Sequence, residues 1–329
     1  MRSETSLDAA SRGEPVGVLA FGRMDTRHVG HTFAPFVVQA DARQLRLFAK
    51  ATGQNDPVYT DVHVAMAAGH PALPLPPTFL VCLEMDAPDP NALLTLLGLD
   101  PRQRLLHAEQ GVIYHRMAYC GDRLGFHQRL DQVYEKKGGA LQFAVRSTRV
   151  TNQRDELVAE LRCVVVAVHE AVPAVAAPDP APALTSSQGH TVPEDGADAL
   201  PVLETAPITR FDLALYAAAS GDHNPVHVDI DFARAAGFDD VFAHGMLVMA
   251  HAARGLTDWV PQHRLRALQL RFQSMTRIGE RLRCEARITG RITGRTKHAG
   301  EALLRIDLTV CDARGVVKAS GQATITATS

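Results

Sequence analysis

A carboxylate and an imidazole stand five residues apart in the segment SGDHNPVHVD, at Asp222 and His227. Pro225 between them indicates a turn, and a chain that folds back at a turn can direct both side chains at one water molecule. Because the reference pKa of histidine is about 6.5, a neutral imidazole and a nearby carboxylate can exchange a proton near neutral pH. The pair predicts acid/base chemistry on water, and it leaves open which group is the base.

A second motif, HGML, begins at His244 and opens a long apolar run that predicts a buried helix. Unpaired N–H groups and the positive dipole end of a helix N-terminus stabilise a developing oxyanion. Gly245 lacks a side chain, so its N–H can approach such an oxygen closely, and Met246 follows as a candidate substrate contact. We interpret His244 as a hydrogen-bonded structural histidine at the helix start.

Two other polar residues flank the turn. Asn224 can hydrogen-bond across the turn or orient His227. Asp229 has two interpretations: it fixes the other imidazole nitrogen, or it caps the following helix, and capping is favoured.

A metal site is the alternative interpretation, because His223, His227 and Asp229 form the string HxxxHxD with His244 downstream. On a helix, His223 and His227 would share one face and converge on one ion. A turn at Pro225 destroys that spacing, and a second cluster of ligands is lacking. We therefore expect no metal.

The elements around these motifs follow from the periodicity. Residues 209–219 predict a short helix with Thr209 as N-cap and an apolar stripe at helical spacing, consisting of Phe211, Leu215 and Ala218. The segment DIDFARAAG predicts another short helix closed by Gly237. After HGML the period changes: LRALQLRFQSM, RLRCEARITGRI, ALLRIDLTVCD and VVKASGQATITA alternate apolar and polar residues. These segments predict a four-stranded antiparallel meander that wraps the long apolar helix, which is an α+β plan.

The sequence also repeats itself. LRLFAKATGQNDPVYTDVHVAMAAG from Leu45 aligns without gaps on LALYAAASGDHNPVHVDIDFARAAG from Leu213, at a spacing of 168 with 12 identities. Further on, CGDRL at Cys120 corresponds to IGERL at Ile278 at a spacing of 158. Such self-similarity indicates two related domains. An Ala/Pro-rich linker is expected at 170–200, between an N-terminal domain at 1–169 and a C-terminal domain at 201–329.

Composition narrows the function classes. The chain has 329 residues, which is too many for one small core, and a net charge of −2, which provides no field for nucleic acid or an anionic membrane. The five cysteines are scattered singly, which argues against disulfides and structural zinc. A signal core and an 18-residue apolar window are lacking, so we expect a soluble cytoplasmic protein.

The motifs SGDHNPVHVDIDFARAAGF and VFAHGML together resemble the MaoC-like, or (R)-specific, enoyl-CoA hydratase family, whose domains have the hotdog fold. The resemblance covers the second half in outline, and the first half resembles the N-terminal dehydratase-like domain of tandem double-hotdog proteins. It implies a double hotdog fold, catalysis by Asp222 and His227, and an oxyanion site at the N–H of Gly245. It also implies a CoA thioester as substrate, with no redox cofactor or metal.

The alignment predicts one site rather than two. In the first half, Gln54 stands at the position of Asp222, Tyr59 at that of His227, and the residues Pro76, Pro77 and Thr78 at that of HGM. Glutamine takes up no proton, and a phenol with a pKa of about 10 is a poor replacement for imidazole. The first half is therefore expected to be catalytically silent and to form one wall of the substrate groove, with its helix PPTFLVCLEM as a candidate.

Cations for the CoA phosphates are sought among the arginines of the second half. Arg254, one or two turns along the central helix from Gly245, is preferred, and Arg264, Arg266 and Arg271 are further candidates. A solvated charge is the alternative interpretation for each of them.

The hypothesis is a hydratase or dehydratase that interconverts trans-2-enoyl-CoA and (R)-3-hydroxyacyl-CoA. A hotdog acyl-CoA thioesterase and a non-catalytic acyl-CoA binding subunit are the alternatives, because fold alone does not determine function. Acyl chain length, branching, a dicarboxylic acyl group, the direction in the cell and the choice between CoA and carrier-protein thioesters stay open. A homodimer is an open alternative for the oligomeric state.

Overall fold

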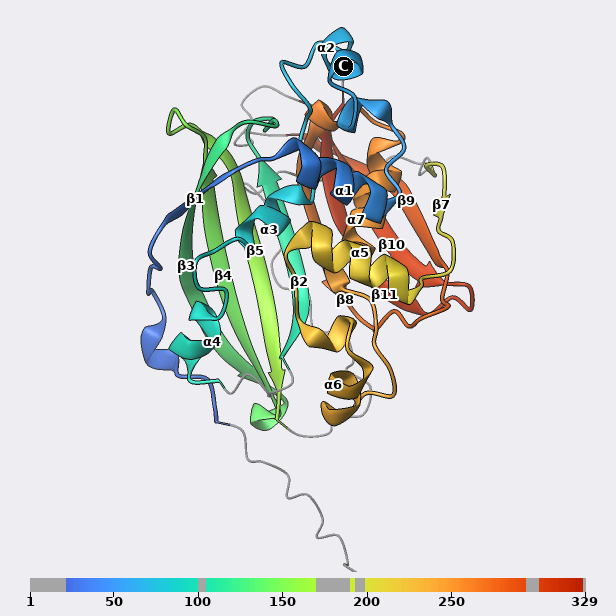
Figure 1. Ribbon diagram of the computed structural model, residues 1–329. Helices are drawn as coiled ribbons and strands as arrows, with labels where there is room; N and C mark the ends of the chain where they lie inside the picture. The colour runs from blue at the N-terminus through green and yellow to red at the C-terminus, as the bar shows by residue number, and fades with distance from the viewer. Residues whose placement is uncertain (1–21, 100–104, 170–189, 193–198, 294–301, 328–329) are drawn as a thin grey trace, which may run out of the picture.

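The chain is described by a computed structural model at residues 22–99, 105–169, 190–192, 199–293 and 302–327. Both halves contribute to one 11-stranded antiparallel sheet, shown in Figure 1. The strands of the first half are β1 (Phe36–Gln39), β2 (Leu105–Tyr114), β3 (Arg123–Lys136), β4 (Leu141–Thr151) and β5 (Leu157–Val168). Those that follow are β6 (His190–Val192), β7 (Leu203–Glu204), β8 (Leu265–Phe272), β9 (Leu282–Thr293), β10 (Leu303–Asp312) and β11 (Val317–Thr326).

Strands β2 and β8 join the two halves edge to edge. Gly111 pairs with Gln269 in this ladder, and the two positions differ by 158, the spacing that relates the strands of the two halves. The Gly111–Gln269 pair is therefore its own counterpart, and a pseudo-twofold axis passes through it. A continuous sheet leaves neither half with an exposed edge at this point.

The strand order corrects the expected meander. Strands β9, β10 and β11 do form a meander, but β8 pairs with β11, and the same holds in the first half, where β2 pairs with β5. In each half the chain crosses from the first of the four strands, β2 or β8, to the strand at the opposite edge of the four, β3 or β9. This crossing brings β2 and β8 to the inner edges, where they can pair with each other.

Helices gather against one face of the sheet (Figure 1). In the first half they are α1 (Ala42–Thr52), α2 (Val62–Ala67), α3 (Phe79–Glu84) and α4 (Ala92–Leu97), with single 3-10 turns η1 (Thr26–His28), η2 (Pro57–Tyr59) and η3 (Lys137–Gly139). In the second half they are α5 (Arg210–Ser220), α6 (Ile230–Ala235) and α7 (Gly245–Thr257), with turns η4 (Pro225–His227) and η5 (Gln262–Arg264).

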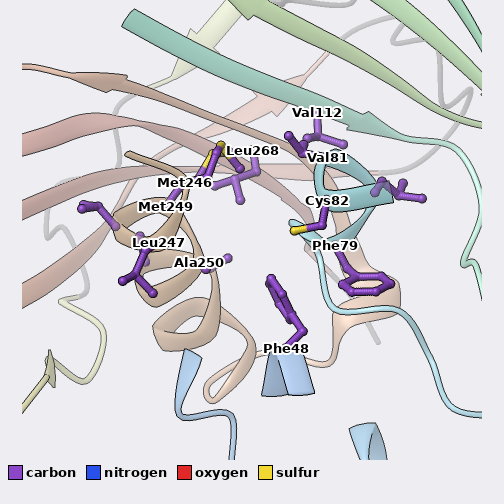
Figure 2. Packing of buried hydrophobic residues seen from close by; sticks show 14 of the residues in the cluster. Phe48, Phe79, Val81, Cys82, Val112, Met246, Leu247, Met249, Ala250 and Leu268 are labelled. Carbon is purple, nitrogen blue, oxygen red and sulfur yellow. The ribbon is translucent and has the colours of Figure 1, made fainter. Parts of the chain in front are cut away.

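One hydrophobic core serves both halves. Figure 2 shows Met246 and Met249 of α7 beside Leu268 of β8, with Phe48 and Phe79 of the first half nearby. The rings of Phe48 and Phe79 meet edge to face, with centroids 5.2 Å apart. Each such side chain contributes about 1.5–3 kcal/mol on burial. Because the cluster crosses the joint, the two halves stabilise each other.

Helix α5 begins as expected but turns a different face inward. Thr209 caps it in a reciprocal capping box with Asp212. Phe211, however, is 66% exposed. The buried residues are Leu213, Tyr216, Ala217, Ala219 and Ser220, whereas of the stripe Phe211, Leu215 and Ala218 only Leu215 packs partly against the core. Small residues on the inner face let α5 lie close to α1, a packing that hydrophobicity alone does not reveal.

The central helices of the two halves differ in length. Helix α7 has 13 residues, whereas α3, its counterpart, has 6 and ends at Glu84. Pro88 and Pro90 follow shortly after that end. Proline lacks an N–H and disfavours helix in the residue before it, so the chain leaves the helix there.

Most of the expected linker, residues 170–200, lies outside the described residues, as do the first 21 residues of the N-terminal domain. Within the linker, His190–Val192 forms β6 and pairs with β9, a strand that the composition did not indicate. Among the described residues, every helix is too short or too polar to cross a membrane.

Candidate active site

The turn after α5 carries the predicted catalytic pair. Gly221 ends α5 in the left-handed conformation, with a φ of 73°, and Asp222 follows it. The next residues form η4, in which the Asn224 side chain accepts a hydrogen bond from the N–H of Val226 at 3.2 Å. Asn224 thus acts across the turn. This local folding turns His227 inward, where it is 8% exposed, while Asp222 stays partly accessible.

The protonation of His227 follows from its partner. Its Nδ1 lies 2.8 Å from the carbonyl oxygen of Phe242, and because a carbonyl only accepts, Nδ1 must carry the proton. In the neutral ring, Nε2 then holds the lone pair. Burial lowers the pKa of His227, and the charge of Asp222 opposes that shift. A neutral imidazole with a basic Nε2 is the form that takes a proton from water.

His244 lies directly against this pair. Its ring centroid is 3.9 Å from that of His227, and its Nε2 lies 3.3 Å from the backbone carbonyl oxygen of Asp222. Burial, together with the neighbouring His227, lowers the pKa of His244 to about 4. It is therefore neutral near pH 7, and its Nε2–H donates to Asp222. This geometry agrees with the structural interpretation, because His244 holds the backbone that carries the carboxylate.

The geometry changes the metal alternative. Ligand atoms of Asp222, His227 and His244 lie within 4.8 Å of one another, which is close enough to hold an ion. Of the string HxxxHxD, only His227 belongs to this set: His223 is exposed, and Asp229 caps α6 by accepting from the N–H groups of residues 231 and 232. Capping is the role favoured for Asp229. A metal test at this site therefore concerns Asp222, His227 and His244.

The start of α7 faces the same region. The side chain of His244, the N-cap residue, makes no capping hydrogen bond within the described part of the chain. The first N–H groups of α7, including that of Gly245, are thus available to an oxyanion. A Cβ on Gly245 would lie 3.2 Å from three ring carbons of Phe272. Packing against Phe272 is a further reason for glycine at this position.

The expected substrate contacts are placed differently. Met246 is 7% exposed and packs in the core of Figure 2. The Nη1 of Arg254 donates to the carbonyl oxygens of Thr52 at 2.8 Å and Gly53 at 2.7 Å, which ties α7 to the C-terminus of α1. We assign Arg254 to the contact between the halves rather than to a phosphate.

Arg271 is likewise engaged inside the protein. Its Nε donates to Glu109 at 2.7 Å, and Arg162 and Gln269 also bind that carboxylate. Glu109 is 4% exposed. A buried carboxylate requires such partners, so Arg271 neutralises the joint between β2 and β8.

In the first half, the residues that correspond to the candidate site make structural contacts. Gln54 is buried and accepts a hydrogen bond from the N–H of Asp56 at 3.0 Å. Asp56 caps η2 at Val58, as Asn224 caps η4. Burial raises the pKa of Tyr59 well above its usual value. This half keeps the capped turn of the site but has Gln54 and Tyr59 in place of Asp222 and His227.

Three contacts of the site were not apparent from the sequence. The carbonyl of Phe242 determines the tautomer of His227, and Phe272 covers Gly245. His107, from the first half, meets the Phe272 ring edge to face at 5.1 Å. Each joins segments distant in the sequence, and backbone carbonyls and aromatic rings carry no motif. Only the strand pairing across the joint could have indicated His107.

Comparisons with known proteins place this site in a family. Residues 27–161 match the FAS1-like, dehydratase domain region, and residues 198–308 match the MaoC like domain. A UPF0336 protein of Saccharopolyspora erythraea is 31% identical over 145 residues, which cover 44% of this chain and 91% of the relative. A solved MaoC-like dehydratase superposes with a TM-score of 0.72 at 22% identity, covering 91% of this chain and 98% of that one.

A conserved hypothetical protein from Mycobacterium tuberculosis, described as having a double hotdog fold, superposes with a TM-score of 0.61 at 15% identity over 91% of this chain and 96% of that one. The fold is therefore that of a double hotdog protein, with Asp222 and His227 on a turn of its second half. The chain belongs to the MaoC-like dehydratase family, with a FAS1-like dehydratase region in its first half.

Proposed function

We propose that the protein interconverts trans-2-enoyl-CoA and (R)-3-hydroxyacyl-CoA by adding or removing water. The observation that carries the proposal is the basic Nε2 of His227, presented beside the Asp222 carboxylate and the free N-terminus of α7. Membership in a dehydratase family supports the reaction class. The acyl-CoA substrate and the stereochemistry are more specific than that class, and they rest on the resemblance of the motifs.

In the hydration direction, one water molecule lies between Nε2 of His227 and the carboxylate of Asp222. His227 takes a proton from the water, and the remaining hydroxide bonds to C3 of the enoyl group. The electron pair of the C2–C3 double bond moves onto the thioester oxygen, which the N–H of Gly245 stabilises. Asp222 and His227 then return the proton to C2, which restores the carbonyl. One water is consumed, and the enzyme is unchanged.

The test is hydration of crotonyl-CoA and longer enoyl-CoA substrates, followed by loss of enoyl absorbance, with the chirality of the product determined. Asp222→Asn and His227→Gln are each expected to lower kcat/KM about 10²- to 10⁴-fold, because each removes a proton-transfer group. Tyr59→Phe is the matched control at the counterpart position and should keep the wild-type rate. A folded Asp222→Asn protein with full activity would refute the assignment.

The same assay separates the alternatives. A thioesterase releases free CoA thiol, which a thiol reagent detects, whereas a hydratase leaves the thioester intact. A binding subunit turns over none of the substrates. If the trio of Asp222, His227 and His244 held a required metal, dialysis against a chelator would abolish activity and added metal would restore it. The proposed mechanism uses no metal, so activity is expected to survive dialysis against the chelator.

A further inference from the structure

A pocket of about 240 Å³ lies between the halves, away from Asp222 and His227. The first half contributes Pro76 and Pro77 before α3, and the segment 114–118 at the end of β2. The second half contributes the segment 262–266 around η5. Because both halves form its walls, the pocket exists only in the joined protein.

The pocket is the counterpart of the candidate active site. At the spacings of the repeat, Pro76 corresponds to His244, Pro77 to Gly245, and Tyr114 to Phe272. The two sites lie at opposite ends of the β2–β8 ladder, related by the axis through the Gly111–Gln269 pair. In the second half the Phe272 ring packs on Gly245, whereas in the first half the Tyr114 hydroxyl donates to the carbonyl oxygen of Pro77 at 2.7 Å. The end of the ladder opposite the candidate active site thus has a cavity.

The residues that line the pocket suit a ligand with an anionic group and an apolar part. Its cationic and potentially cationic members are Arg116, Arg266, His115 and His263, and its apolar surface includes Leu80. Among the described residues that line it, none is a carboxylate. Carboxylates also contact the lining from outside: Glu156 lies 3.4 Å from Arg116, and Glu160 lies 3.5 Å from His115.

The contact between Arg116 and Glu156 is weak enough for a ligand to compete. Arg116 is 54% exposed and Glu156 is 30% exposed, and pairs of this kind contribute about 1 kcal/mol or less. A guanidinium has five donors, so Arg116 can bind an entering anion while it stays near Glu156. On the other side of the pocket, Arg266 is anchored by a 2.6 Å bond from Nη1 to the carbonyl oxygen of His263.

We propose that this pocket binds a small amphipathic anion without turnover. The carboxylate or phosphate group lies between Arg116 and Arg266, and the apolar part lies on the surface around Leu80. Gln54 and Tyr59 stand at the positions of the catalytic pair, and neither lines the pocket, so the bound molecule is not hydrated. The proposal is independent of the hydratase activity.

Calorimetric titration of the full chain with octanoate and with octyl phosphate tests the proposal and distinguishes the two headgroups. We expect one site per chain and unchanged binding in the Asp222→Asn protein. Arg116→Gln should weaken binding roughly tenfold, because it removes a charge-assisted hydrogen bond. Arg266→Gln should act similarly. Arg129→Gln is the matched control, since Arg129 is 58% exposed and lies 3.9 Å from a carboxylate outside the pocket.

Three results would overturn the proposal. These are no binding of either anion at millimolar concentration, equal binding by the Arg116→Gln and wild-type proteins, or displacement of the anion by crotonyl-CoA in the Asp222→Asn background. The last result would place the anion in the catalytic site. Arg116 is exposed, so its glutamine variant is expected to fold, and a thermal melt checks this.

Discussion

The Nδ1 atom of His227 lies 2.8 Å from the carbonyl oxygen of Phe242, and this contact determines which imidazole nitrogen is basic. A carbonyl oxygen accepts and never donates, so the lone pair of the neutral ring is on Nε2. The partner belongs to the backbone, and side-chain substitution at Phe242 therefore preserves it. The tautomer of the candidate base is thus a property of the fold.

The first prediction concerns the pH dependence of kcat/KM. Activity requires neutral His227, and burial lowers its pKa from 6.5. Activity should therefore be constant as pH falls to about 6.5 and decrease only below it. Asp222 raises the pKa of His227, so the residual activity of Asp222→Asn should persist to lower pH. A decrease that begins above pH 7 would mean that His227 is not the base.

The second prediction concerns Gly245 and Phe272. The added Cβ of Gly245→Ala would lie 3.2 Å from three carbons of the Phe272 ring, so the ring or the helix start must shift by a few tenths of an ångström. We expect kcat/KM to fall about tenfold, because oxyanion donors act only when they are placed accurately. The double variant with Phe272→Leu should recover part of the loss. Equal activity of Gly245→Ala and wild type would argue against an oxyanion role.

The third prediction concerns Arg254. Arg254→Met removes two hydrogen bonds from a charged donor to the carbonyls of Thr52 and Gly53. We expect the free energy of unfolding in urea to decrease by about 2–4 kcal/mol. Arg129→Met, at an exposed arginine, should change it by less than about 0.5 kcal/mol. If Arg254 instead bound CoA phosphate, KM would rise and stability would change little.

The fourth prediction concerns Glu109. Its carboxylate accepts from Gln269 and Arg271, each at 2.7 Å, and pairs with Arg162 as well. Glu109→Gln removes the carboxylate that two largely buried arginines share, which should destabilise the protein by about 3–5 kcal/mol. Asp240→Asn, which breaks an exposed pair with Arg210, is the control and should cost at most about 1 kcal/mol. Similar unfolding midpoints for the two variants would contradict this account of the joint.

The repeat and the periodicities predicted much of the fold correctly. They identified strands β8 to β11, the helix that begins at Gly245, and the caps at Thr209 and Asp229. Such features depend on residues within a few positions of one another. The inward face of α5 did not follow from the stripe, because Phe211 is exposed and only Leu215 of the stripe packs partly against the core. Which face is buried depends on the partner helix, and the local pattern does not contain that partner.

By itself, the sequence determined that the chain is a duplicated α+β protein whose second half alone keeps Asp222 and His227 on a turn, because repeats, turn residues and acid/base groups are local properties. Only the tertiary structure decided the crossing of β8 to β11, the pairing of β2 with β8, and the partners of Arg254 and Arg271. It also decided that the ring of His244 lies against that of His227 and that a pocket lies at the other end of the β2–β8 ladder. These features join segments far apart along the chain, and which of them meet depends on packing the whole chain around one core.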